Sequence, residues 1–120
     1  MKKIVFWGFA GILLSAIPMA YAASDNVILG TPGPEKLVGT DEHDLIKGLG
    51  GQDRLWGNGD ADRLKGGGGN DRLHGRSNDD EDTGYVDVLN GGAGWDRCEA
   101  KTTAKFISCE VITIVPGNNI

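Results

Sequence analysis

The sequence predicts an all-β solenoid, and three columns of a nine-residue repeat support this prediction. Glycine opens seven successive units, at intervals of nine residues and finally after an interval of sixteen. These glycines are Gly30, Gly39, Gly48, Gly57, Gly66, Gly75 and Gly91. A fixed short period indicates a solenoid, in which each unit stacks only on its neighbours.

The second and third columns are acidic and apolar. The sixth position holds Glu35, Asp44, Asp53, Asp62, Asp71, either Asp80 or Asp87, and Asp96. The eighth position holds Leu37, Ile46, Leu55, Leu64, Leu73, Leu89 and Cys98. Positions 7 to 9 form a short strand, whose alternation directs position 8 inward. Glycine lets positions 1 to 6 turn with positive φ. A carboxylate beside backbone carbonyls at the end of every turn suits a hard cation such as calcium.

These columns resemble the RTX (repeats-in-toxin) family, whose hemolysin-type calcium-binding nonapeptide repeats follow the pattern Gly-Gly-x-Gly-x-Asp-x-apolar-x. The resemblance covers residues 30–99 and is plainest in units 48–56 and 66–74. It implies a parallel β-roll, a right-handed β-solenoid, with Ca²⁺ held between the turns of units n and n+2.

The implied metal ligands form two columns, together with the turn backbone. One column is Glu35, Asp53, Asp71 and Asp96; the other is Asp44, Asp62, and either Asp80 or Asp87. The turn glycines assigned to the metal sites are Gly48, Gly50, Gly66 and Gly68. The first unit departs from the pattern at Pro32, Pro34 and Glu35, so we expect a capping turn that binds calcium weakly. An insertion near residues 79–86 carries the acidic run 79–82, which is either a further ligand set or a solvated loop.

The N-terminus reads as a secretory signal peptide. Lys2 and Lys3 precede a largely apolar stretch over residues 4–17, and Ala20-Tyr21-Ala22 fits the cleavage pattern. An uncleaved anchor is the alternative. We therefore expect a signal peptide (1–22), a lead-in (23–29), the β-roll (30–99) and a C-terminal β cap (100–120). The protein is expected to be secreted, with a periplasmic location left open, and to have no membrane contact after cleavage.

Charge and side-chain chemistry narrow the function. The net charge is −5, and loss of Lys2 and Lys3 makes the chain still more acidic, so nucleic acid is not an expected partner. No set of residues suggests a nucleophile with its base, so we expect no enzymatic activity. The function that the sequence favours is calcium binding coupled to folding.

Two cysteines, Cys98 and Cys109, are expected to form a disulfide in a secreted domain of this size. A redox pair is the less favoured interpretation, because the chain has no Cys-x-x-Cys. The β-prone run 106–115 is predicted to cover the open end of the roll, with the disulfide fastening it there.

One outward column is cationic and allows an alternative function. Position 7 on one face holds Lys36, Arg54, Arg72 and Arg97, with Trp56 beside them. These are either ordinary solvated charges or part of a groove for an acidic polysaccharide. The resemblance supports the second interpretation, since RTX-type modules attached to alginate-modifying enzymes bind in this way. In this alternative the chain is a carbohydrate-binding or adhesive module, and calcium is structural.

Overall fold

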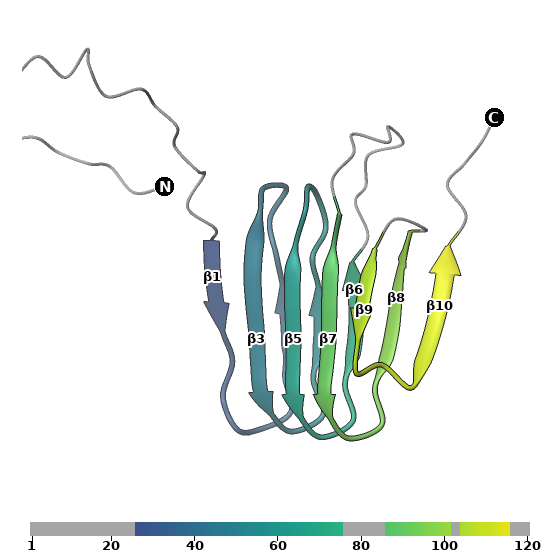
Figure 1. Ribbon diagram of the computed structural model, residues 1–120. Coiled ribbons are helices and arrows are strands. Elements are labelled where there is room, and N and C mark those ends of the chain that lie inside the picture. Colours follow the sequence, from purple (N-terminus) through teal and green to yellow (C-terminus); the bar gives the residue numbers. More distant parts are fainter. Residues whose placement is uncertain (1–25, 76–85, 102–103, 116–120) are drawn as a thin grey trace, which may run out of the picture.

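The computed structural model describes residues 26–75, 86–101 and 104–115, and these residues form two parallel β-sheets (Figure 1). The expected signal peptide and the acidic run 79–82 lie outside the described residues. The first sheet, sheet A, contains in spatial order β1 (Asn26–Leu29), β3 (Asp44–Gly50), β5 (Arg63–Gly68), β7 (Val88–Ala93) and β9 (Lys105–Ile107). The second, sheet B, contains β2 (Lys36–Val38), β4 (Arg54–Trp56), β6 (Arg72–Gly75), β8 (Arg97–Lys101) and β10 (Val111–Val115).

Successive strands alternate between the sheets, so the chain winds as a β-solenoid of about four turns. Every strand pairs in parallel with the strand two positions along the chain. Lys36 pairs with Arg54, Arg54 with Arg72, and Arg72 with Arg97. The last step spans the insertion, so the extra residues leave the register of the sheets unchanged. The predicted parallel β-roll is confirmed.

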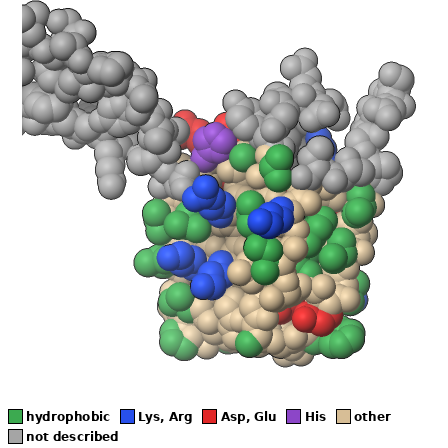
Figure 2. Space-filling view, viewed as in Figure 1, with side chains coloured by type: hydrophobic (Ala, Val, Ile, Leu, Met, Phe, Trp, Pro, Cys, Tyr) green, Lys and Arg blue, Asp and Glu red, His purple; other side chains and the backbone are tan. Residues whose placement is uncertain are grey.

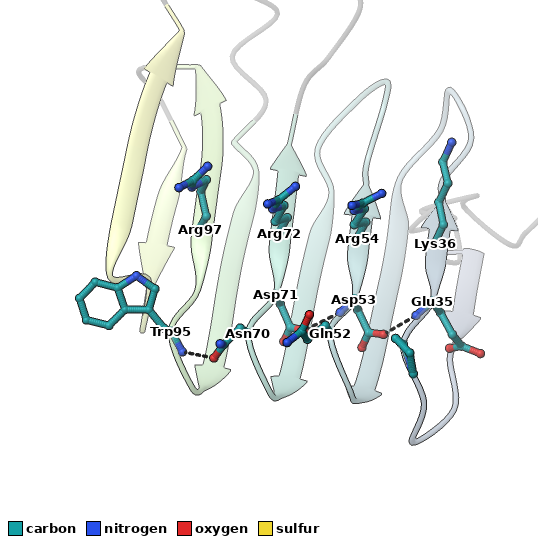
Figure 3. Close-up of a pocket in the computed structure, with 11 residues that line it drawn as sticks. Glu35, Lys36, Gln52, Asp53, Arg54, Asn70, Asp71, Arg72, Trp95 and Arg97 are labelled. Carbon is teal, nitrogen blue, oxygen red and sulfur yellow. Dashed lines mark hydrogen bonds between the residues drawn. The ribbon is translucent and has the colours of Figure 1, made fainter.

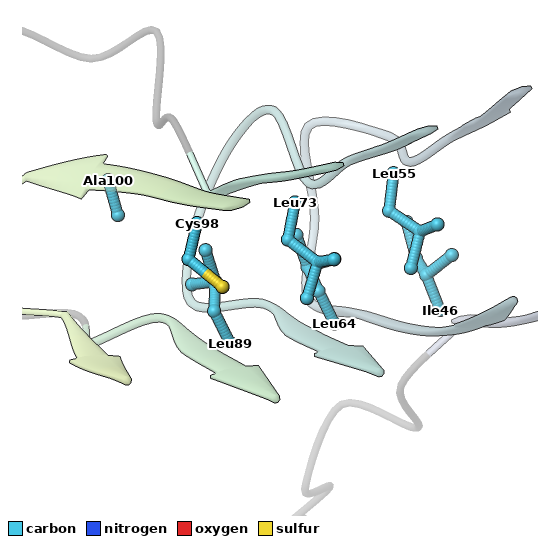
Figure 4. Packing of buried hydrophobic residues seen from close by; sticks show 7 residues of the cluster. All are labelled: Ile46, Leu55, Leu64, Leu73, Leu89, Cys98 and Ala100. Carbon is cyan, nitrogen blue, oxygen red and sulfur yellow. The ribbon is translucent and has the colours of Figure 1, made fainter. Parts of the chain in front are cut away.

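The core is a single row of side chains from each sheet (Figure 4). The eighth-position residues Ile46, Leu55, Leu64, Leu73, Leu89 and Cys98 are at most 1% exposed, and Ala100 joins them. Their neighbours on either side in the strands point outward, as strand alternation requires. The prediction that position 8 faces inward is confirmed. Apolar packing between the two sheets is therefore limited to this one row of side chains from each sheet.

The outer surface of sheet A mixes side-chain types. Figure 2 shows hydrophobic and basic side chains interspersed over this face. The position-7 column there is Val27, Leu45, Arg63, Val88 and Lys105.

Within the described part of the chain, no helix is long and apolar enough to cross a membrane.

Both ends of the repeat differ from the simplest expectation. Residues 26–29, expected as a lead-in, form β1 and pair with β3. At the other end, β9 pairs with β7 and β10 with β8, so the C-terminal run adds a further coil. The run therefore stacks on the last repeat, as the expected C-terminal β cap does, and it continues the register of the roll. Phe106 and Ile112 repeat the inward position of Leu89 and Cys98, and this periodicity continues the roll.

A disulfide joins Cys98 to Cys109, as the sequence predicts. Cys98 is buried in β8, and Cys109 lies in the turn between β9 and β10, with 5.9 Å between the two Cα atoms. Cys109 also packs against the core. The bond therefore ties the last turn to the interior of the coil before it.

We expect loss of this disulfide to destabilise the roll by about 2–3 kcal/mol, because the bond closes a short loop and constrains the unfolded chain. Urea unfolding of Cys98→Ser/Cys109→Ser in excess calcium measures the effect. Calcium binding by the central turns should persist, since Asp53 and Asp62 lie on earlier coils. Two free thiols in the native protein would contradict this account of the last coil.

Candidate metal centre

The acidic side chains of the first column are linked by hydrogen bonds from the backbone, and Figure 3 shows those that join Glu35, Asp53 and Asp71. The N–H of Asp53 donates to Oδ1 of Asp71 at 2.9 Å, and the N–H of Asp71 donates to Oδ1 of Asp96 at 2.8 Å. Glu35 N–H donates to Oδ1 of Asp53 at 2.9 Å. Each carboxylate therefore accepts from the unit one coil earlier. This places the whole predicted first column in one line.

The second column has the same geometry, and Asp87 belongs to it. Asp44 N–H donates to Oδ1 of Asp62, and Asp62 N–H donates to Oδ1 of Asp87, both at 3.0 Å. Asp87 therefore occupies the column position after Asp62. Asp80 lies outside the described residues.

Glu110 extends the first column by one step, which the sequence reading missed. Its Oε2 accepts a hydrogen bond from Asp96 N–H at 2.6 Å, as an aspartate does in earlier coils. The available signal was spacing: Glu110 stands two residues before the inward Ile112, as Asp71 stands before Leu73. The missing position-1 glycine concealed this relation.

The second carboxylate oxygen of the central aspartates is buried without a hydrogen-bond partner. This holds for Oδ2 of Asp53, Asp62, Asp71 and Asp96. All four residues are at most 1% exposed. A buried carboxylate oxygen without a donor or a cation is costly. These atoms are therefore positioned to receive a positive charge.

The first carboxylate of each column is different, because a threonine satisfies it. Thr31 donates to Glu35 from its backbone N–H at 2.7 Å and from its hydroxyl at 2.9 Å. Thr40 donates to Oδ2 of Asp44 from its N–H at 2.5 Å and from its hydroxyl at 3.2 Å. In both of these units the turn itself supplies the donors that the later units lack.

The turn conformation changes at the same point in the chain. Positive φ occurs at position 2 in Leu49, Asn58, Gly67 and Gly92, and at position 4 in Gly51, Asp60, Gly69 and Gly94. Thr31 and Thr40, at position 2 of the first two units, are not among the positive-φ residues. The left-handed turns thus coincide with the aspartates whose Oδ2 has no partner. Asp60 shows that aspartate tolerates this conformation at position 4.

The position-1 glycines serve a purpose other than the expected one. None of them has positive φ; instead, the carboxylate of the same unit packs against the bare Cα. A Cβ on Gly48 would overlap Oδ2 of Asp53 and lie 2.6 Å from the carbonyl oxygen of Gly66. A Cβ on Gly66 would likewise overlap Oδ2 of Asp71. The invariant glycine therefore makes room for a carboxylate and a carbonyl side by side.

Burial raises the pKa values of aspartates in both columns, so their environment favours neutralisation of the carboxylate charge. Burial raises the pKa of Asp62 to about 8, against an ordinary value of 3.8, and Asp87 and Asp44 raise it further. Burial likewise raises the pKa of Asp71 and that of Asp87 to about 6. Burial raises the pKa values of Asp53 and Asp96 as well. In every case the hydrogen bond from the backbone lowers the pKa but does not cancel the effect of burial.

Comparison with known families identifies this repeat. The model of the RTX calcium-binding nonapeptide repeat (4 copies) matches residues 29–64, 56–81 and 82–101, which together span more than half of the chain. The chain belongs to the RTX calcium-binding nonapeptide-repeat family. Repeats of this family bind Ca²⁺, so calcium is the cofactor of this RTX protein. No curated protein and no solved structure matches the chain.

The remaining predicted ligands are glycines of the turn backbone. Gly50 and Gly68 pair in register within sheet A, and a Cβ on Gly68 would meet no atom within 4 Å. Within the described ranges, no three His, Cys, Asp or Glu side chains form a group that could hold a metal ion. The expected ligand set, in which backbone carbonyl oxygens of the turns complete what single carboxylates begin, stays a prediction.

Two neighbouring glycines test the steric role of position 1. Gly66→Ala should destabilise the calcium-bound roll by about 1–3 kcal/mol, because its Cβ displaces the Asp71 carboxylate. Gly68→Ala should change stability by about 0.5 kcal/mol or less, since its Cβ enters open space. Urea unfolding in excess calcium compares the two. Equal losses would contradict the proposed role of Gly66.

The raised pKa values predict the pH dependence of the calcium-free chain. A carboxyl whose pKa is raised on folding favours the folded state when protonated. This contribution is complete below about pH 4 and is lost as the pH rises through about 6 for Asp71 and Asp87, and about 8 for Asp62. In chelator, β signal in circular dichroism should therefore increase from about pH 8 to about pH 5. In limiting calcium the trend should reverse, because protons compete with the metal. A calcium-free signal that falls on acidification would contradict the electrostatic account.

Proposed function

We propose that this RTX protein is a secreted, non-enzymatic β-roll that folds when it binds calcium. The observation that carries this proposal is the set of buried Oδ2 atoms without a hydrogen-bond partner. Bound calcium would supply the positive charge that these carboxylates lack. Because the cation binds the folded arrangement, its binding free energy adds to the stability of the fold.

The best-supported ligand residues are Asp53, Asp62, Asp71 and Asp96. Each combines a hydrogen-bonded Oδ1 with a buried Oδ2 that has no partner. Asp87 follows Asp62 in the second column, and burial raises its pKa as well. Asp44 has the same place in the column, but Thr40 already donates to its oxygens. We therefore rank Asp44 below the central four and Glu35 last, because Glu35 is satisfied by its own turn and lies nearer solvent.

Coupling of folding to calcium follows from the thin core. One buried apolar side chain per nine-residue unit must offset the conformational entropy of a glycine-rich chain. The aspartates also stack one coil apart, about 4.8 Å along the sheets, where unneutralised carboxylates repel. Hydrophobic burial and the disulfide offset only part of the entropy cost and of the carboxylate repulsion. Bound calcium would remove the repulsion directly.

Secretion is the expected route to this calcium. Proteins with RTX repeats are typically extracellular, and extracellular fluid is rich in calcium. The Cys98–Cys109 disulfide suits an oxidising compartment. The signal peptide expected at residues 1–22 would deliver the unfolded chain through the general secretory pathway.

Calcium titration of chelated protein tests the proposal. Far-ultraviolet circular dichroism should show β structure rising cooperatively with calcium, and Mg²⁺ should substitute poorly because it requires stricter octahedral geometry. Asp71→Ala should weaken calcium affinity about tenfold or more, while Glu35→Ala should have a smaller effect. The two variants match, because both remove a carboxylate from the same column. Equal effects would contradict the ranking, and an unchanged spectrum in chelator would contradict calcium-coupled folding.

A second candidate function is binding of an acidic polysaccharide, and a groove on sheet B favours it (Figure 3). The groove has a volume of about 610 Å³ and runs along the solenoid axis between positions 5 and 7. The position-7 wall is Lys36, Arg54, Arg72 and Arg97, and the position-5 wall is Pro34, Gln52, Asn70 and Trp95. Between them lie Glu35, Asp53 and Asp71 of the first carboxylate column. The basic wall could be predicted from the sequence, whereas the other wall could not, because position 5 varies in residue type.

The basic wall stacks like charges. Arg54, Arg72 and Arg97 are register partners, and like charges directly opposite one another destabilise a sheet. In the described part of the chain no carboxylate forms a salt bridge with these three arginines. A linear polyanion running along the groove would relieve the repulsion, and the exposed Trp95 offers a ring on which a sugar can stack.

Binding of short oligouronates at fixed calcium tests this second function. Arg72→Glu should abolish binding, because it reverses the central charge of the wall. Lys65→Glu on the outer face of sheet A is the matched control and should bind normally. Binding should also weaken as salt is added. Equal loss in both variants would indicate attraction to overall charge and would contradict a groove site.

A further inference from the structure

Among the described residues, both ends of the roll are edge strands. We call β1 and β2 the leading end, and β9 and β10 the trailing end; they lie at opposite ends of the stack (Figure 1). Each sheet's pairing stops at these strands, and no other described element pairs with their outer edges. An edge strand presents backbone donors and acceptors that a further strand can pair with.

The trailing end exposes residues that belong to the core column. Ile112 pairs in register with Cys98 and Ile114 with Ala100, and both partners are 0% exposed. Ile112 is nevertheless 48% exposed and Ile114 is 52% exposed, since no further coil follows within the described residues. Their position is that of interior residues, so only another coil of the same fold would bury them.

The leading end presents the complementary surface. Ile28 pairs with Ile46 and Leu37 with Leu55, so both point inward, and both pack only partly against the core. Continuing the register by one coil across two chains places Phe106 opposite Ile28, and Ile112 opposite Leu37. The exposed Leu29 would meet Ile107 on the outer face of sheet A. The join therefore places apolar side chains on apolar side chains in every one of these columns.

The charges at such a join also fit. In position 7, Lys105 would lie opposite Val27, and Val111 opposite Lys36, so no cations face each other there. This contrasts with the arginines stacked inside the chain. The like charges that do meet are Glu110 and Glu35, which end and begin the first carboxylate column. Their meeting repeats the arrangement that calcium neutralises within the chain.

We propose that the folded, calcium-bound roll associates head to tail with a second copy, the trailing end of one chain pairing with the leading end of the next. This inference rests on the proposed calcium-dependent fold. The contact joins two different surfaces, so it leaves one leading and one trailing end free and permits longer chains of copies.

Sedimentation velocity of the secreted protein over a range of concentrations tests the proposal. Wild type in calcium should form dimers and longer species, and it should be monomeric in chelator. Ile112→Lys/Ile114→Lys blocks the trailing end and should weaken association about tenfold or more. Val27→Lys blocks the leading end, because the new lysine faces Lys105 of the other copy. Val86→Lys, at an exposed apolar site outside both ends, should associate like wild type.

Mixing the variants gives the sharpest result. The trailing-blocked and leading-blocked chains should each be monomeric alone and form dimers, but nothing longer, when mixed. Adding Lys105→Glu to the Val27→Lys chain should restore head-to-tail association, because two lysines no longer face each other across the contact. If the isoleucine pair impairs folding, Val27→Lys and its rescue still decide the matter, since Val27 is exposed.

Circular dichroism of the same samples separates this inference from the proposed function. A wild-type chain that folds with calcium yet stays monomeric at all concentrations would overturn the head-to-tail contact and leave calcium-coupled folding intact. Association that persists in the end-blocked variants would also overturn it. A chain whose fold does not depend on calcium would overturn the proposed function instead.

Discussion

The buried carboxylate column is the constraint on which the rest of this structure depends. An aspartate at position 6 accepts a hydrogen bond from the backbone one coil earlier through Oδ1, which holds successive coils together. The same residue leaves Oδ2 in the interior of the turn without a partner. One atom therefore organises the stack and the other creates a need for a cation. The family's calcium chemistry follows from this division of roles.

The rhythm of glycines in the sequence is a consequence of that column. Position 1 is glycine because the carboxylate of the same unit packs against its Cα, as the Asp53 carboxylate packs against Gly48. Positions 2 and 4 turn the backbone into the left-handed region, which releases the carboxylate from local donors. Where threonine occupies position 2, in Thr31 and Thr40, the hydroxyl and N–H donate to the carboxylate of the same unit. The two leading units thus differ from the later ones both in turn conformation and in the donors to their carboxylates.

The sequence predicted the repeating parts of this protein well, because repetition amplifies a weak local signal. The inward column from Ile46 to Cys98, the two carboxylate columns and the disulfide all lie where their spacing placed them. Three features required the structure. Glu110 lacks the preceding glycine, and the choice between Asp80 and Asp87 depends on how the insertion leaves the register. The groove wall contains Gln52, Asn70 and Trp95, which occupy the same repeat position but differ in side-chain type. The sequence therefore shows no recognisable column there.

Amide hydrogen exchange tests the central claim most directly, since it reports on the core strands residue by residue. At neutral pH in calcium, the amides of Leu55 and Leu73 should be strongly protected, as should those of Asp53 and Asp71, which donate to the carboxylate column. In chelator, the account predicts that all four exchange at close to unfolded rates, because the unpartnered carboxylates destabilise the whole stack together. Equal protection of these amides with and without calcium would contradict it, and would mean that the apolar core and the disulfide hold the roll without the metal.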